Sequence, residues 1–277
     1  MKREIFAIRA GHFLPAICFL IFSACAKPPP EQREFALGTL CSVNLYEYGT
    51  RQLYSRIFAR IREIERTMSA RQGTLQIEPT DLMKINENAG IAPVKIPRDL
   101  FEVLERAKYY AQISGGAFDP TIGPLVNLWG IGTEQEKVPT PDEISDALSL
   151  VNWQDLILES GEQTAYLSRR GMALDLGAIA KGYAADEAAR IACDSNAKRG
   201  IIDLGGNILA IGGRSQTGNT EAPWRIGVQN PLKKRGTYIG VLSLRDRSVV
   251  TSGIYERNFV FEGKVYHHIL SVKDGYP

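Results

Sequence analysis

Two stretches of the chain repeat apolar residues at spacings of three and four, which is the period of an amphipathic α-helix. The first covers residues 51–68, with its apolar stripe at Leu53, Ile57, Ile61, Ile64 and Met68. The second covers residues 100–114 and ends at two glycines, Gly115 and Gly116. We expect both stripes to pack into the core, and we assign them no chemistry.

Short apolar runs between polar turns predict β-strands in most of the remaining body. One run lies at residues 40–46, and the others follow residue 155, at 156–158, 165–167, 172–176, 201–204, 208–211, 224–228, 238–244, 248–251 and 258–261. A third helix is predicted at residues 179–193, where six alanines allow close approach of neighbouring elements. In this order of predicted elements, helices come first and mostly short, turn-linked strands come later. Such an order favours an α+β fold over a regular βαβ array.

The N-terminus joins a basic start to a short apolar run at residues 13–22. That run is shorter than the roughly 20 residues of a membrane span, so we interpret residues 1–24 as an export signal. The following Phe22-Ser23-Ala24-Cys25 resembles a bacterial lipobox, which implies lipidation of Cys25. An ordinary cleavable signal and an uncleaved signal anchor stay open as alternatives.

Residues 25–34 contain three consecutive prolines and several charged side chains. Such a segment favours an extended polyproline II conformation, so it predicts a stiff polar tether. The folded domain is then expected to cover residues 35–277.

Composition and charge narrow the function classes. The chain is 44% hydrophobic and 23% charged, which is typical of a globular protein. Three of its 33 basic residues and one of its 31 acidic residues lie in residues 1–24, so the remainder has no net formal charge. A neutral body lacks the basic stripe of nucleic-acid-binding proteins, and we therefore exclude that class.

Cysteines and histidines are scarce after the leader. Cys41 and Cys193 could pair in an oxidising compartment, although we favour two buried free thiols. The chain has no CxxC motif, and only His267 and His268 follow the leader, which argues against a zinc site. Any metal should therefore be a hard cation held by oxygen atoms.

A first candidate site is the glycine-rich stretch at residues 115–125. Its two glycines allow a ligand to approach the backbone, Phe118 offers an aromatic face, and Asp119 places a carboxylate at a turn. The alternative is a helix C-cap followed by a turn with a buried aromatic ring.

A second candidate site lies at residues 174–186, where Asp175 ends a predicted strand and Lys181 lies in the first turn of a helix. A lysine there opposes the helix dipole, so a bound phosphate explains it well. In the alternative, Asp175 caps the helix and Lys181 is solvated. A third candidate stretch, with a glycine pair at residues 205–206, also suits a hairpin turn.

The adjacent histidines lie in a predicted strand, where they point to opposite faces. His268 shares a face with Tyr266 and Leu270. It is the candidate base at neutral pH.

Residues 38–277 resemble the ApbE-type flavin transferases, which move FMN from FAD onto a serine or threonine of a target protein. The resemblance is carried by five ordered motifs: Gly116-Ala117-Phe118-Asp119-Pro120-Thr121, Asp175 to Ala184, Leu204-Gly205-Gly206-Asn207, Thr251-Ser252-Gly253 and His267-His268-Ile269. It implies an α+β, T-fold-like domain of mixed, largely antiparallel sheets with packed helices.

The resemblance also implies ligands and roles. FAD would be the substrate and Mg²⁺ the metal. Leu37 would lie against the flavin, Ala117, Phe118 and Asp119 along the adenine and ribose, Asp175 and Lys181 on the dinucleotide, and Leu270 against the cofactor. Ala178 would give its carbonyl to Mg²⁺, and His268 would deprotonate the acceptor hydroxyl.

The implied reaction transfers FMN to a Ser or Thr of an exported redox protein and releases AMP, with Mg-dependent hydrolysis of FAD as a companion. The family pattern continues past Pro277 with an Asp and a Thr of the magnesium site, so we expect the domain at residues 35–277 to lack that segment. A non-catalytic FAD-binding lipoprotein is the alternative, and a tethered structural domain is a third reading. The expected location is the periplasm, with a lipid anchor in the inner membrane.

Overall fold

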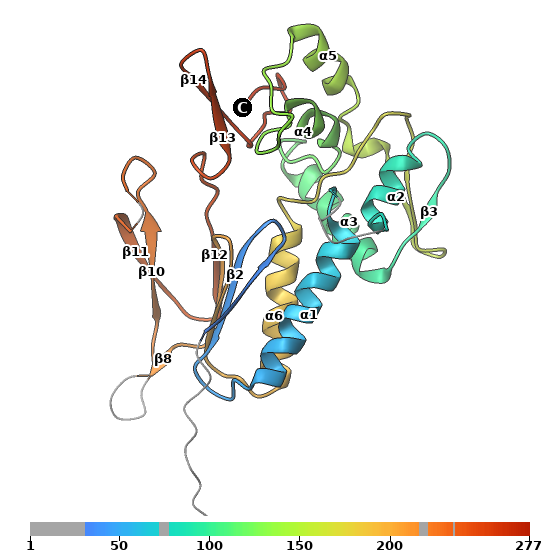
Figure 1. Ribbon diagram of the computed structural model, residues 1–277. Helices are drawn as coiled ribbons and strands as arrows, with labels where there is room; N and C mark the ends of the chain where they lie inside the picture. The colour runs from blue at the N-terminus through green and yellow to red at the C-terminus, as the bar shows by residue number, and fades with distance from the viewer. Residues whose placement is uncertain (1–30, 72–77, 216–220, 235) are drawn as a thin grey trace, which may run out of the picture.

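The computed structural model describes residues 31–71, 78–215, 221–234 and 236–277. Its centre is an antiparallel five-stranded sheet with the strand order β1-β2-β6-β7-β12 (Figure 1). These strands are β1 (Gln32–Ala36), β2 (Thr39–Leu45), β6 (Gly200–Leu204), β7 (Asn207–Ile211) and β12 (Arg247–Val250).

Two long helices, α1 (Arg51–Met68) and α6 (Ala180–Asp194), lie side by side on one face of this sheet (Figure 1). The sheet supplies alternate side chains of β2 and β6 to the interface, while α1 supplies its predicted stripe. Thr50 caps α1 by accepting a hydrogen bond from the Leu53 amide at 3.1 Å. Small alanines on the buried face of α6 let it approach both partners.

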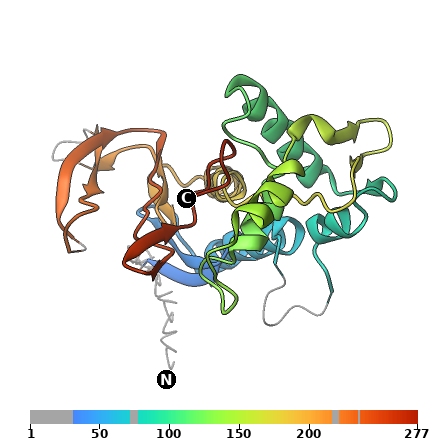
Figure 2. The same ribbon diagram turned by 90° about the horizontal axis from the view of Figure 1, so that it is seen from above.

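A second group of elements lies on the far side of α6 from the long hairpin β10 (Trp224–Gln229) and β11 (Tyr238–Leu244) (Figure 2). Its three-stranded sheet has the order β3-β5-β4. The group contains α2 (Asp81–Glu87), β3 (Val94–Lys95), α3 (Arg98–Ile113), α4 (Gly123–Trp129), α5 (Pro141–Ser149), the 3₁₀ turn η1 (Trp153–Asp155), β4 (Leu156–Glu159) and β5 (Thr164–Leu167).

A smaller core joins α4 and α5 to the hairpin formed by β13 (Asn258–Phe261) and β14 (Lys264–His267). Trp129 is its centre: it is fully buried, its ring lies 5.4 Å from the Tyr266 ring, and its Nε1 donates to the Gly275 carbonyl at 2.8 Å. The short strands β8 (Arg214–Ser215) and β9 (Glu221–Ala222) complete the described elements. Trp129 therefore fixes both the hairpin and the C-terminal residues.

The α+β prediction is confirmed, and the predicted helices 51–68, 100–114 and 179–193 are present within two residues of their expected bounds. The strand predicted at 172–176 is wrong. That segment is buried and extended, but it forms only a single bridge, between Ala173 and Ile122. Its backbone is instead bonded to the Asn86 side chain, which donates to the Leu174 carbonyl and accepts from the Leu174 amide.

The predicted tether is too long at its C-terminal end. Gln32 and Arg33 belong to β1. They pair with β2 in the same antiparallel register as Phe35 and Ala36. The folded part therefore begins before residue 35. The predicted signal at 1–24 and Cys25 lie outside the described residues.

Cys41 and Cys193 are both free thiols, as favoured. Cys41 is buried, and its burial raises the pKa of that thiol to about 11. Cys193 is exposed at the last turn of α6, so the prediction of burial is wrong for this residue. Among the described residues, no helix combines the length and the apolar character that crossing a membrane requires.

Candidate active site around Asp175, Lys181 and His268

Backbone hydrogen bonds bring the first two candidate sites together. The Asp175 amide donates to the Pro120 carbonyl at 2.9 Å, and the Gly123 amide donates to the Ala173 carbonyl at 3.0 Å. A Cβ atom on Gly123 would lie 2.5 Å from that carbonyl oxygen, so only glycine permits this approach. The stretch after α3 and the stretch before α6 therefore form one continuous wall.

Asp119 lies in this wall with both carboxylate oxygens occupied. Its Oδ1 accepts from the Thr121 amide at 2.8 Å and from the Thr121 hydroxyl at 2.6 Å. Its Oδ2 accepts from the Trp153 amide at 2.9 Å. Asp119 is buried, so its carboxylate holds the loop and η1 together.

Ala117 and Asp119 line a pocket with a volume of about 550 Å³. Gly115 and Gly116 form one side of it, and Trp153 and Lys273 contribute from η1 and the C-terminal residues. Phe118 is half-buried against the main core. Of the three residues predicted to line the adenine side, Phe118 is thus the one that does not line this pocket.

Lys181 lies at the second position of α6, and its side chain points back past the helix start. Its Nζ donates to the Gly177 carbonyl at 3.2 Å. The structure therefore does not have the alternative, in which Lys181 lies on a solvated helix face. Burial, and then the charge of Arg257, lowers the pKa of Lys181, while Asp175 acts in the opposite direction. Asp175 does not cap α6, because its Oδ1 accepts from the Gly177 amide at 2.8 Å.

Arg257 is a site residue that none of the sequence motifs contains. It follows the Thr251-Ser252-Gly253 motif, which was the available signal. Its guanidinium donates to the Gly38 carbonyl at 3.1 Å, in the turn that also carries Leu37. Within the described part of the chain, neither Arg257 nor Lys181 forms an ion pair with a carboxylate.

His268 was expected within a strand. The strand β14 ends at His267, so His268 lies one residue beyond it. Its amide and its Nδ1 both lie against the Arg257 carbonyl, at 3.1 and 3.2 Å. A carbonyl oxygen only accepts hydrogen bonds, so Nδ1 carries the proton and Nε2 keeps a free lone pair. Burial lowers the pKa of His268. The hydrogen bond to the Arg257 carbonyl acts in the opposite direction, and the charges of Arg257, His267 and Lys181 add to the lowering.

Leu37 and Leu270 flank the same region. Leu37 has a positive φ of 53° in the β1–β2 turn and packs against the main core. Leu270 packs against the smaller core around Trp129. Both side chains therefore join the site to a hydrophobic core.

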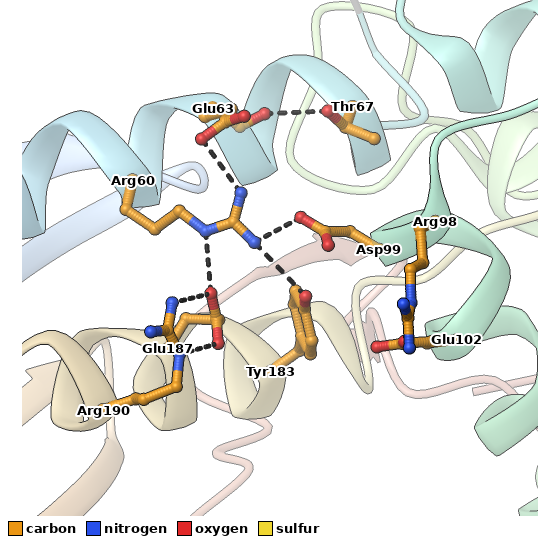
Figure 3. A network of polar contacts seen from close by, with 9 residues as sticks. All are labelled: Arg60, Glu63, Thr67, Arg98, Asp99, Glu102, Tyr183, Glu187 and Arg190. Carbon is orange, nitrogen blue, oxygen red and sulfur yellow. Dashed lines mark hydrogen bonds and ion pairs between the residues drawn. The ribbon is translucent and has the colours of Figure 1, made fainter.

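A cluster of ion pairs holds α6, and with it Lys181, in place (Figure 3). Arg60 of α1 bonds Glu187 of α6 at 2.9 Å, Asp99 of α3, and the Tyr183 hydroxyl at 3.3 Å. Its side chain is only 16% exposed, so these charge-assisted bonds are weakly screened by solvent. The first turns of α6 are thereby joined to two other helices.

The oxygen atoms available to a hard cation are few. Ala178 is exposed, and its carbonyl accepts no hydrogen bond from the residues that the structure describes. The described residues contain no group of three or more His, Cys, Asp or Glu side chains that could hold a metal ion. Because Mg²⁺ takes six oxygen ligands, these residues do not form a magnesium site by themselves.

Comparisons with known proteins agree with this geometry. The ApbE family model matches residues 37–277. An FAD:protein FMN transferase of Treponema pallidum is 36% identical over 258 residues, which cover 89% of this chain and 70% of that protein. An FAD:protein FMN transferase of Klebsiella pneumoniae is 36% identical over 241 residues, 87% of this chain and 71% of the relative.

Solved structures share the fold. The crystal structure of the ApbE protein of Thermotoga maritima superposes with a TM-score of 0.79 at 32% identity, covering 89% of this chain and 77% of that one. The flavin transferase ApbE of Vibrio cholerae has a TM-score of 0.74 at 24% identity, with coverage of 89% and 77%. The mixed, largely antiparallel architecture expected from the sequence is confirmed.

Proposed function

This chain belongs to the ApbE family, and on that premise we propose that it is an FAD:protein FMN transferase that moves FMN from FAD to a Ser or Thr hydroxyl of an exported redox protein. The observation that carries the proposal is that His268 lies against Arg257, with its amide and Nδ1 at 3.1 and 3.2 Å from the Arg257 carbonyl, and that the charge of Lys181 acts on His268 as well. Two cations without carboxylate partners suit a diphosphate, and a neutral imidazole suits a hydroxyl that must lose its proton.

The proposed step forms one bond and breaks one bond. The acceptor oxygen attacks the phosphorus of the FMN half, an O–P bond forms, and the diphosphate P–O bond breaks so that AMP leaves. The proton of the hydroxyl passes to Nε2 of His268, because Nδ1 is held at the Arg257 carbonyl. Lys181 and Arg257 stabilise the charge on the phosphates. With water as the acceptor, the same step gives FMN and AMP.

Mg²⁺ is the metal we propose for this site, with the Ala178 carbonyl as its one protein ligand among the described residues. The phosphate oxygens and water would have to supply the remaining ligands. Comparing turnover with Mg²⁺ and with a chelator tests this assignment.

The direct test of the function is incubation with FAD and Mg²⁺, with chromatography of FMN and AMP. Equal amounts of AMP and of FMN, either free or attached to an acceptor serine or threonine, support the proposal. FAD that binds and remains intact under all of these conditions contradicts it.

Lys181→Ala is expected to weaken FAD binding by about 10- to 100-fold, the range for a lost charge-assisted hydrogen bond. Isothermal titration with FAD measures the change. Lys84→Ala is the matched control, because Lys84 is paired with Asp81 on the exposed side of α2 and should leave the affinity unchanged. Equal affinity of Lys181→Ala and the unaltered protein would remove Lys181 from the diphosphate site.

We propose a periplasmic location with a lipid anchor at Cys25 in the inner membrane, supported by the lipobox-like sequence. Labelling of expressing cells with radioactive palmitate should mark the protein and should fail with Cys25→Ser. Cys193→Ser serves as the control that keeps the label, since the exposed Cys193 thiol is not part of the lipobox-like sequence. A protein that is exported without label would support the ordinary cleavable signal instead.

A further inference from the structure

One end of the domain has exposed groups that the proposed reaction does not use. At this end Glu31 lies close to Tyr46, and burial together with the charge of Glu31 raises the pKa of that tyrosine. The Tyr46 amide donates to the Arg199 carbonyl at 3.0 Å, and Gly200, at the start of β6, pairs with both β2 and β7. The first described residue, the loop before α1, the loop after α6 and the end of β7 therefore lie together, at the lower end of Figure 1.

Positive charge at this end is not fully neutralised. Arg51, Lys198 and Arg214 are exposed, and none of them forms an ion pair with any carboxylate that the structure describes. Lys198 and Arg214 are neighbours, because Gly212 lies against the Lys198 carbonyl. Four acidic side chains of the same end are already occupied by ion pairs, namely Glu31 with Arg33, Glu47 with Arg199, Asp194 with Arg190 and Glu221 with Arg245. Asp246 accepts a hydrogen bond from the Gly212 amide, so the unpaired cations outnumber the unpaired acids here.

Arg51 lies where its own helix disfavours an arginine. It is the first residue of α1, directly after the N-cap Thr50, and the first turn of this helix contains no acidic side chain. The helix dipole places partial positive charge at this end, so an arginine without an ionic partner is unfavourable here. An anionic surface outside the protein would remove that repulsion.

Two exposed tyrosines lie at the same end. Tyr48 is 63% exposed, and its backbone has a positive φ of 57°, which is strained for a bulky residue. Tyr46 is 43% exposed, and its ring lies 4.8 Å from the Trp224 ring. Exposed tyrosines beside arginine and lysine are typical of surfaces that lie at the headgroup level of a membrane. We call the surface formed by Tyr46, Tyr48, Arg51, Lys198 and Arg214 the basal surface.

The basal surface lies at the opposite end of α6 from the candidate active site. Lys181 is in the first turn of this helix and Asp194 is its last residue, and a helix of 15 residues is about 22 Å long. The β1–β2 turn, which Arg257 bonds through Gly38, likewise lies at the other end of β2 from Tyr46. A membrane against the basal surface would therefore leave the diphosphate site facing outward, where an acceptor protein can reach it (Figure 1).

We infer that the basal surface docks the domain onto the anionic phospholipid headgroups of the membrane that holds its N-terminal anchor. The inference rests on the proposed anchor only for bringing the domain to that membrane. A cation next to an anionic bilayer strengthens binding by about fivefold. The anchor keeps the domain at a high local concentration, so a few cations and two tyrosines suffice to hold it against the surface.

Quenching of tryptophan fluorescence by brominated lipids tests the docking. The full chain with Tyr48→Trp is reconstituted into vesicles of brominated phosphatidylglycerol or of brominated phosphatidylcholine. We expect quenching of the added indole to be at least about fivefold stronger in the anionic vesicles. About 1 M NaCl should abolish this difference, because it shortens the Debye length to about 3 Å. Tyr238→Trp is the matched control: Tyr238 is 59% exposed but pairs with Gln229 at the other end of the β10–β11 hairpin from Trp224, so its indole should not be quenched.

Charge reversal in the Tyr48→Trp protein tests which residues hold the surface. Arg51→Glu combined with Lys198→Glu should lower the quenching in anionic vesicles by more than about tenfold. A glutamate suits the first turn of a helix, so unfolding of α1 does not explain such a loss. Lys233→Glu combined with Lys234→Glu changes the net charge equally at an exposed pair between β10 and β11, and it should keep the quenching.

The outcomes separate the docking from the proposed function. Equal quenching in both lipids, or quenching that survives the reversal at Arg51 and Lys198, would overturn the inference. Neither double variant should change the release of FMN and AMP from FAD, because both pairs are remote from His268. A chain that docks as described but never releases FMN would contradict the proposed function and leave the docking intact. Failure of palmitate labelling would contradict the lipid anchor alone, since the same quenching decides the docking of a chain held by an uncleaved signal.

Discussion

Replacing His268 with alanine is expected to lower the rate of FMN transfer by about 10²- to 10⁴-fold, the usual contribution of a general base. FAD affinity should stay close to that of the unaltered protein, because the phosphates are held by Lys181 and Arg257. Single-turnover assays with a fixed acceptor measure the chemical step, and titration with FAD measures binding. Transfer that persists at the original rate would remove His268 from the mechanism.

The adjacent histidine provides the matched control. His267 lies at the end of β14, opposite Asn258, and its Nδ1 is buried without a hydrogen-bond partner in the described structure. His267→Gln should keep most of the transfer activity. A loss as large as that of His268→Ala would show that the hairpin, and not the base, was damaged.

The pH dependence of FMN transfer follows from the groups that surround His268. Burial and the charges of Arg257, His267 and Lys181 lower the pKa of His268 from its ordinary value of 6.5. The active, neutral form is therefore already dominant at pH 7, and the rate should fall only when the pH drops below 6.5. Arg257→Gln removes one of these charges but keeps the backbone carbonyl, so it should move this acid limb to higher pH.

Replacing Trp129 with alanine is expected to lower the free energy of unfolding by about 3–5 kcal/mol, the usual cost of removing a fully buried large aromatic. The loss comes from the cavity between α4 and the β13–β14 hairpin and from the missing bond to the Gly275 carbonyl. Denaturant unfolding followed by circular dichroism measures it.

The Trp129 substitution should also affect transfer, because Tyr266 packs on Trp129 only two residues before His268. Trp129→Phe retains most of the ring and loses the hydrogen bond, so it should cost about 1 kcal/mol and remain folded for assay. Trp224→Ala is the matched control: this buried indole lies in β10 beside Tyr46. It should be destabilising without changing transfer by the remaining folded protein. A stable Trp129→Ala protein would contradict the role of this second core.

Local pattern was sufficient for the long elements. The stripe from Leu53 to Met68 and the alanine-rich run from Ala180 predict α1 and α6, because a helix needs only its own periodicity and a neighbour to cover it. Short elements such as α2 and α4 have seven residues each, too few for a period to be recognised. The extended segment at 172–176 has a strand's composition, yet its partners are a side chain and a single bridge.

The sequence by itself determined the family, the α+β class and the motifs that contain Asp175, Lys181 and His268. The side chains of these three residues define their own chemistry, and the order of the motifs along the chain matches that of the family. The tertiary structure decided what each group does: Arg257 enters the site because the turn before β13 folds back onto Gly38. The Asp119 carboxylate accepts a hydrogen bond from the Trp153 amide, which lies 34 positions later in the sequence. Such contacts depend on distances between segments, and no local pattern encodes those distances.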